Sequence, residues 1–150
     1  MTTTGRPAPA GPGPDLTARL RGASTGALIM LILQFALGVG VNLYVSPAKG
    51  GIGEAFSNGV LLTLHAVLGL LLIVAAAGHL ALSVRARRTG QLVLSAVGLI
   101  AILVAASGGA EFLSSQGNGQ SMGMALAAAV AMLCYAICLR ISVATGPAAG

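Results

Sequence analysis

The sequence predicts an all-α integral membrane protein: a four-helix, up-down-up-down bundle with both termini in the cytoplasm. Composition is the first observation, because 56% of the 150 residues are hydrophobic, only 7% are charged, and the mean hydropathy is +0.93. A soluble domain carries about 25% charged residues. The other two observations are four long apolar stretches and a one-sided distribution of arginines.

The four apolar stretches cover residues 24–45, 60–84, 91–112 and 121–143. Each approaches or exceeds the roughly 20 residues that a membrane-spanning helix needs. The stretches are continuous rather than alternating, which favours helices over the short strands of a barrel. We therefore expect one membrane domain over residues 23–144, with the first apolar stretch kept as an uncleaved anchor.

The segments outside the stretches are short or rich in glycine and proline. Residues 1–22 are predicted to be a disordered cytoplasmic tail, and residues 145–150 a short C-terminal tail. The link "RARRTG" after the second stretch is so short that the second and third helices should pack as antiparallel neighbours. No connection is long enough to fold as a domain, so any chemistry is expected inside the bundle or at its two faces.

The basic residues predict the orientation of the bundle. Seven of the eight lie on one set of connections, which cytoplasmic loops are expected to retain. These are Arg6, Arg19, Arg21, Arg85, Arg87, Arg88 and Arg140, whereas Lys49, Glu54 and Glu111 belong to the opposite set. The plasma membrane is the expected location and the lipid bilayer the expected partner. No basic cluster is interleaved with aromatics, so a nucleic-acid partner is not expected.

A few polar or reactive side chains fall within the apolar stretches, where each needs an explanation. For Gln34 we favour an ordinary hydrogen bond between helices, and for Glu111 contact with water near the end of its helix. Cys134 and Cys138 share one helix face and are interpreted as small packing residues.

His65 and His79 are the only histidines, and they bracket the apolar run "HAVLGLLLIVAAAGH". Fourteen residues of helix place them about 21 Å apart along the axis. In a left-handed bundle with a 3.5-residue repeat, this spacing brings both rings to one face. A neutral imidazole can ligate a metal, and haem iron commonly takes a histidine as axial ligand.

This stretch resembles the haem-binding helices of respiratory cytochrome b, in which two histidines are separated by thirteen residues. The resemblance implies two b haems, with His65 and His79 as ligands at two depths. It also implies glycines at matching depths on a neighbouring helix, for which Gly26 and Gly40 are the candidates. The chain lacks the family's second two-histidine helix, so the missing ligands would come from a homodimer formed through residues 60–84, or from Met30 and Met124.

Three functions remain open from the sequence. The first is a di-haem b protein that transfers electrons across the membrane. The second is an accessory or structural membrane subunit without a cofactor, and the third is a small transport component whose histidines titrate. Whether the protein is an enzyme is left open, because no nucleophile–base pair or nucleotide-binding fingerprint is recognised.

Overall fold

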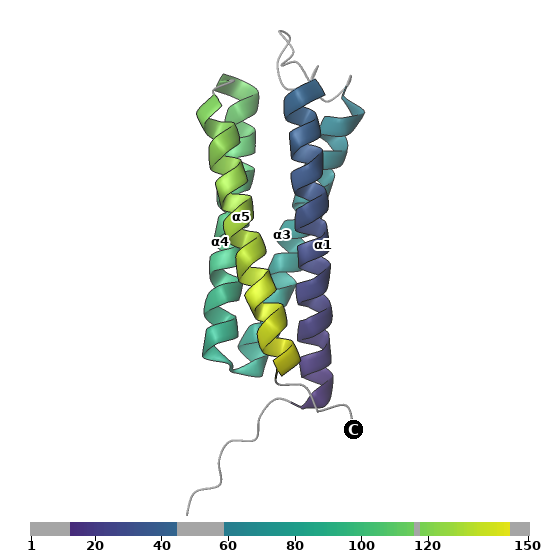
Figure 1. Ribbon diagram of the computed structural model, residues 1–150, viewed down its shortest axis with the longest axis vertical. Coiled ribbons are helices and arrows are strands. Elements are labelled where there is room, and N and C mark those ends of the chain that lie inside the picture. Colours follow the sequence, from purple (N-terminus) through teal and green to yellow (C-terminus); the bar gives the residue numbers. More distant parts are fainter. Residues whose placement is uncertain (1–12, 45–58, 116–117, 145–150) are drawn as a thin grey trace, which may run out of the picture.

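The computed structural model describes residues 13–44, 59–115 and 118–144, and these residues form four α-helices (Figure 1). Their bounds are α1, Pro14–Tyr44; α3, Val60–Ala86; α4, Thr89–Ser115; and α5, Asn118–Ala144. Each helix is long and apolar enough to cross a membrane. The predicted all-α class with four candidate membrane spans is therefore confirmed.

The start of α1 differs from the prediction. The sequence predicts disorder through residue 22, but the helix begins at Pro14. Proline is suited to the first helical position, and Asp15 forms an ion pair at 3.2 Å with Arg19, one turn later. Leu20 is also completely buried, so this segment packs against the bundle. The disorder prediction is wrong for residues 14–22, while residues 1–12 lie outside the described part.

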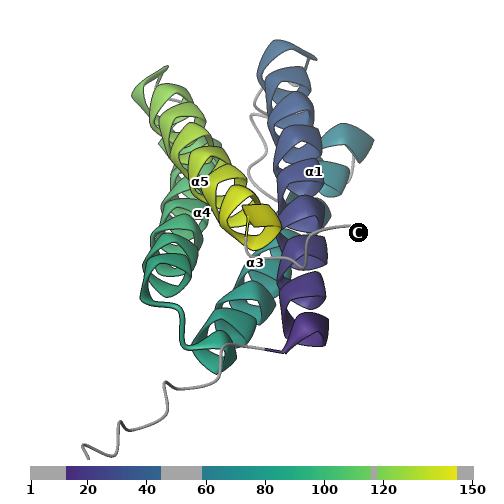
Figure 2. The same ribbon diagram turned by 60° about the horizontal axis from the view of Figure 1, so that its bottom comes forward.

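Helix α1 packs against α3 and α5, and α4 packs against α5 and α3. Helices α1 and α3 run in opposite directions, since Ser24 meets His79 and Gln34 meets His65. The link between α3 and α4 is a tight turn, and the two helices spread apart with distance from it (Figure 2). Far from the turn, α3 therefore lies beside α1 rather than α4.

The start of α1, the α3–α4 turn and the end of α5 lie together at one end of the bundle (Figure 1). We call this the arginine end. Its arginines among the described residues are Arg19, Arg21, Arg85, Arg87, Arg88 and Arg140.

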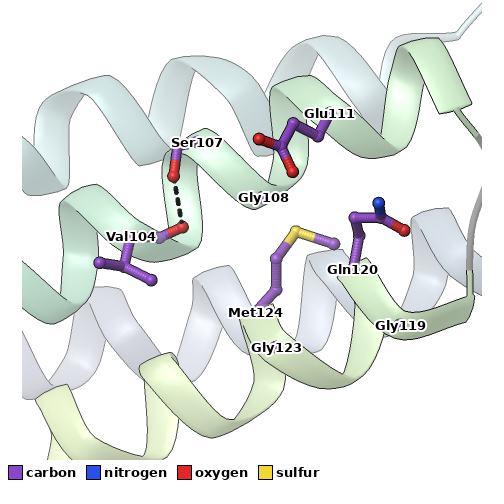
Figure 3. Close-up of a pocket in the computed structure, with 8 residues that line it drawn as sticks. All are labelled: Val104, Ser107, Gly108, Glu111, Gly119, Gln120, Gly123 and Met124. Atoms are coloured by element: carbon purple, nitrogen blue, oxygen red, sulfur yellow. Dashed lines mark hydrogen bonds between the residues drawn. The ribbon is translucent and has the colours of Figure 1, made fainter.

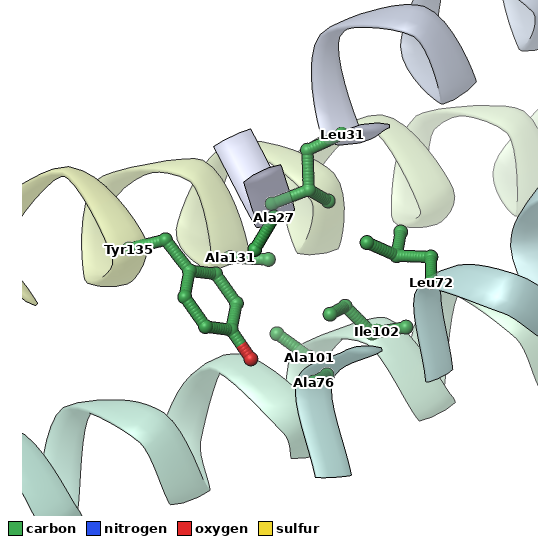
Figure 4. Packing of buried hydrophobic residues seen from close by; sticks show 8 residues of the cluster. All are labelled: Ala27, Leu31, Leu72, Ala76, Ala101, Ile102, Ala131 and Tyr135. Carbon is green, nitrogen blue, oxygen red and sulfur yellow. The ribbon is translucent and has the colours of Figure 1, made fainter. Parts of the chain in front are cut away.

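The apolar core joins all four helices (Figure 4). Its buried members are Ala27, Leu31, Leu72, Ala76, Ala101, Ile102, Ala131 and Tyr135. Half of these residues are alanines, which allow helix backbones to approach closely. On α3 the core residues Leu72 and Ala76 lie between the two histidines, so the core separates their surroundings.

The outward faces of the helices are apolar. Ile29, Val74, Ile100 and Leu133 are each more than half exposed, one from each helix. This pattern is compatible with contact between the bundle and lipid.

Candidate functional site

His79 joins three helices through its two ring nitrogens. The ring is 1% exposed, its Nε2 lies 2.8 Å from Ser24 Oγ of α1, and its Nδ1 lies 2.9 Å from Ser95 Oγ of α4. Ser83, one turn further along α3, lies 2.8 Å from Ser95 Oγ. We call these four residues the His79 cluster. Both polar atoms of the imidazole are occupied by hydroxyls from neighbouring helices.

The serines of the His79 cluster also reach backbone carbonyls one turn earlier in their own helices. The Ser24 hydroxyl is 2.9 Å from the carbonyl of Leu20, and the Ser95 hydroxyl is 2.6 Å from the carbonyl of Gln91. A neutral imidazole has one donor and one acceptor nitrogen. One serine can therefore donate to the ring while the other donates to its carbonyl, and the cluster is satisfied without another group.

Helix α5 completes the surroundings of this cluster. The Gln91 amide donates to Ser142 Oγ at 2.8 Å, and the Tyr135 ring meets the His79 ring edge-on with centroids 5.2 Å apart. The Tyr135 hydroxyl and the Gln91 carboxamide oxygen are buried, and neither has a hydrogen-bond partner among the described residues. The serines were not predicted as site residues, although Gln91 and Ser95, like His79 and Ser83, lie four residues apart in apolar helices.

His65 pairs with Gln34 across the α1–α3 interface, with their Nε2 atoms 3.2 Å apart. Each of these side chains packs over a glycine of the opposite helix. A Cβ on Gly38 would lie 3.0 Å from the His65 ring, and a Cβ on Gly69 would lie 3.0 Å from the Gln34 amide. The two glycines make room for the pair, and the interhelical hydrogen bond expected for Gln34 is present with His65 as its partner.

The His65–Gln34 pair is not internally satisfied. When the Gln34 amide donates to Nε2, the proton of a neutral His65 ring resides on Nδ1. When the carboxamide is turned by half a turn, its oxygen accepts from Nε2–H and Nδ1 keeps a bare lone pair. In both cases Nδ1 is buried without a hydrogen-bond partner among the described residues. An unsatisfied buried polar atom costs about 1–3 kcal/mol and requires an explanation.

The two histidines therefore differ in whether a ring nitrogen lacks a hydrogen-bond partner and is left to bind haem iron. At His79 both nitrogens are taken by serines and the ring packs against Tyr135, so the surroundings do not fit a haem ligated there. At His65, Nδ1 has no partner but is buried beside Gly38 of α1, so haem iron would reach it only if α1 and α3 separated there, and Nε2 can be oriented by an amide oxygen. Metal-ligating histidines commonly have their second nitrogen held in this way.

The glycines proposed from the resemblance do not contact the histidines. Gly26 is exposed, and nothing lies within 4 Å of the position that its Cβ would occupy. A Cβ on Gly40 would meet the Leu61 side chain at 3.1 Å. Gly38, rather than Gly40, is the α1 glycine that packs on His65.

The two candidate methionines lie elsewhere in the bundle. Met30 packs against the apolar core. Met124 of α5 points to Gly108 and Gly109 of α4, where it lines a pocket of about 330 Å³ together with Glu111 and Gln120 (Figure 3). Met124 therefore packs against α4, whereas His65 packs against α1. Neither Met30 nor Met124 is proposed as a haem ligand.

Cys134 and Cys138 are buried free thiols on α5. Cys138 Sγ is 3.9 Å from the carbonyl of Gln91, which is a weak contact. Within the described ranges, no group of three or more His, Cys, Asp or Glu side chains is arranged to hold a metal ion. The interpretation of Cys134 and Cys138 as packing residues stays a prediction.

Comparisons of the chain with family models, with curated proteins and with solved structures find no match. The resemblance of residues 65–79 to cytochrome b is therefore neither supported nor refuted by a relative.

Proposed function

We propose that this protein is a multi-pass membrane protein that binds haem b through His65 and takes part in electron transfer. The observation that supports the proposal is the buried, unpartnered Nδ1 of His65. Haem supplies one-electron chemistry when it is bound. The part played by this chain is to offer a ring nitrogen to the iron and to hold the ring in place.

Gln34 and Gly38 would have defined roles in such a site. The Gln34 carboxamide, with its oxygen toward Nε2–H, would fix the tautomer in which Nδ1 carries no proton. Gly38 lets the ring lie against the α1 backbone. The proposal assigns one haem site to each chain rather than the two implied by the resemblance, because the nitrogens of His79 are both occupied.

The proposal includes a homodimer formed through the exposed face of α3. Leu64, Val67 and Val60 on this face are apolar and exposed, at 52%, 50% and 77%, whereas the His65 ring points away from it, toward Gln34 and Gly38 of α1. Such a surface is available to lipid or to a second helix. We keep the homodimer as part of the proposal, together with the plasma membrane location and the cytoplasmic position of both termini. The gathering of arginines at one end supports this orientation.

The second candidate function is that of a membrane subunit without a cofactor. It is favoured by the His79 cluster, in which a histidine acts as a hydrogen-bonded link between α1, α3 and α4. A small transport component is not favoured, because the apolar core residues Leu72 and Ala76 lie between the two histidines on α3.

The test is an absorption spectrum of the purified protein in its oxidised and reduced states, after expression with ample haem supply. The proposal predicts haem bands that shift on reduction, with no more than one haem per chain. A colourless, folded protein would remove the proposal and leave the subunit without a cofactor as the better account. Two haems per chain would show that His79 has been assigned incorrectly.

A further inference from the structure

The arginine end carries a strong excess of positive charge. Six arginines lie there among the described residues, and the accompanying carboxylate is that of Asp15. Asp15 is paired with Arg19 at 3.2 Å, and both side chains are largely exposed. At the opposite end of the described bundle, the charged residue is Glu111. The positive charge of the described bundle is therefore concentrated at the arginine end.

Several of these arginines have exposed side chains that remain available to a partner. Arg21, Arg85, Arg87 and Arg140 are exposed, and none forms an ion pair with another residue that the structure describes. They come from α1, from the α3–α4 turn and from α5, so the positive charge extends around the end of the bundle (Figure 1).

The backbone at Arg87 is unusual for an arginine. Its φ is 53°, in the left-handed region, and its N–H caps α3 by donating to the carbonyl of Val84. This capping position normally favours glycine, since a side chain there costs free energy. The chain contains 22 glycines, yet it places an arginine here between two other arginines at 85 and 88. Backbone in such a conformation is common at functional sites, so the Arg87 side chain is a candidate for a function.

We propose that the arginine end binds the phosphate groups of anionic phospholipids in the leaflet around it, with Arg85 and Arg87 as its principal contacts. A guanidinium matches a phosphate through paired, charge-assisted hydrogen bonds. The occupant is a lipid rather than a soluble anion, because these arginines border helices whose outward faces are apolar and more than half exposed, as at Val84 (56%). The acyl chains then lie along α3 while the headgroup meets the turn.

The experiment compares lipid binding by the purified protein in a neutral detergent, where membrane orientation plays no part. Native mass spectrometry would measure the retention of phosphatidylglycerol and of phosphatidylcholine with the same acyl chains. The test variant is Arg85→Gln with Arg87→Gln. The charge-conserving control is Arg85→Lys with Arg87→Lys, and inorganic phosphate serves as the soluble anion.

The proposal predicts that the protein prefers phosphatidylglycerol, that the glutamine variant loses at least about tenfold of this preference, and that the lysine variant keeps most of it. Inorganic phosphate in the millimolar range should not displace the lipid. Equal retention of both lipids by the unaltered protein would overturn the proposal, and so would an undiminished preference in the glutamine variant. Displacement of the lipid by phosphate would also overturn it, since the site would then bind a soluble anion. Circular dichroism of each variant confirms that the comparison is between folded proteins.

Discussion

Serine hydroxyls account for the difference between the two histidines at the residue scale. His79 is surrounded by Ser24 and Ser95, which can each donate or accept a proton in a hydrogen bond, so both ring nitrogens are satisfied. His65 has one carboxamide beside it and an apolar helix otherwise, so one nitrogen remains without a partner. This difference separates a structural histidine from a candidate ligand.

Tyr135 gives the first prediction at this scale. Its side chain is fully buried, but its hydroxyl has no hydrogen-bond partner among the described residues. Replacing Tyr135 with Phe removes an unsatisfied polar atom, so the free energy of unfolding should be unchanged or higher by up to about 1 kcal/mol. Thermal unfolding followed by circular dichroism measures this. Tyr135→Ala is the control and should lose about 3–5 kcal/mol of stability through the lost ring packing. A clear loss in Tyr135→Phe would mean that the hydroxyl has a partner.

Small residues set the helix–helix distances at the scale of the elements. Gly98 of α4 lies directly under the Tyr135 ring of α5, and a Cβ at this glycine would be only 2.9 Å from Tyr135 Cε2. Real Cβ atoms do not approach so closely, and the Tyr135 ring also packs edge-on against the His79 ring. Close contact between α4 and α5 therefore depends on the absence of a side chain at position 98.

Gly98→Ala should consequently destabilise the bundle by about 1–3 kcal/mol, because the added methyl group forces α4 and α5 apart. The matched control is Gly78→Ala on the exposed face of α3, where nothing lies within 4 Å of the new Cβ. That change should be neutral or stabilising by up to about 1 kcal/mol, since alanine favours the helix. Melting temperatures of the two variants provide the comparison. Equal melting temperatures would show that the α4–α5 contact does not require the glycine.

The elements could largely be predicted from the sequence, because a run of apolar residues long enough to cross a bilayer has few alternatives to a helix. The start of α1 could not, since the burial of Leu20 against the other helices is a tertiary effect that the Pro- and Gly-rich composition does not reveal. The candidate site was predicted only in part. The spacing of His65 and His79 identified the two polar positions, but which hydroxyl or amide faces each ring depends on how α1 and α4 are rotated. For the same reason, the sequence indicated Gly40 rather than Gly38 as the glycine that packs on His65.

Among the described residues of the whole molecule, arginines gather at one end while Glu111 is the charged residue at the other, and this asymmetry leads to a prediction about topology. The positive-inside rule places the arginine end in the cytoplasm. A reporter fused after Gly150 should therefore behave as cytoplasmic, and a reporter inserted near Asn118 should behave as external. Activity of paired cytoplasmic and periplasmic reporter enzymes measures both positions. Reversed results at the two sites would show that the arginines do not set the orientation.

At the same scale, the central claim is that His65 binds the cofactor and His79 holds the bundle together. The most direct measurement records the oxidised and reduced spectra and the thermal unfolding of His65→Ala and His79→Ala beside the unaltered protein. His65→Ala should lose the haem bands while remaining folded, although Gln34 loses its hydrogen-bond partner. His79→Ala should keep its haem per folded chain but unfold more easily by about 1–3 kcal/mol, because Ser24 and Ser95 lose their partner. Ser95→Ala, which keeps the ring, should retain haem in the same way. Loss of haem from a folded His79→Ala protein, or its retention in His65→Ala, would contradict the account.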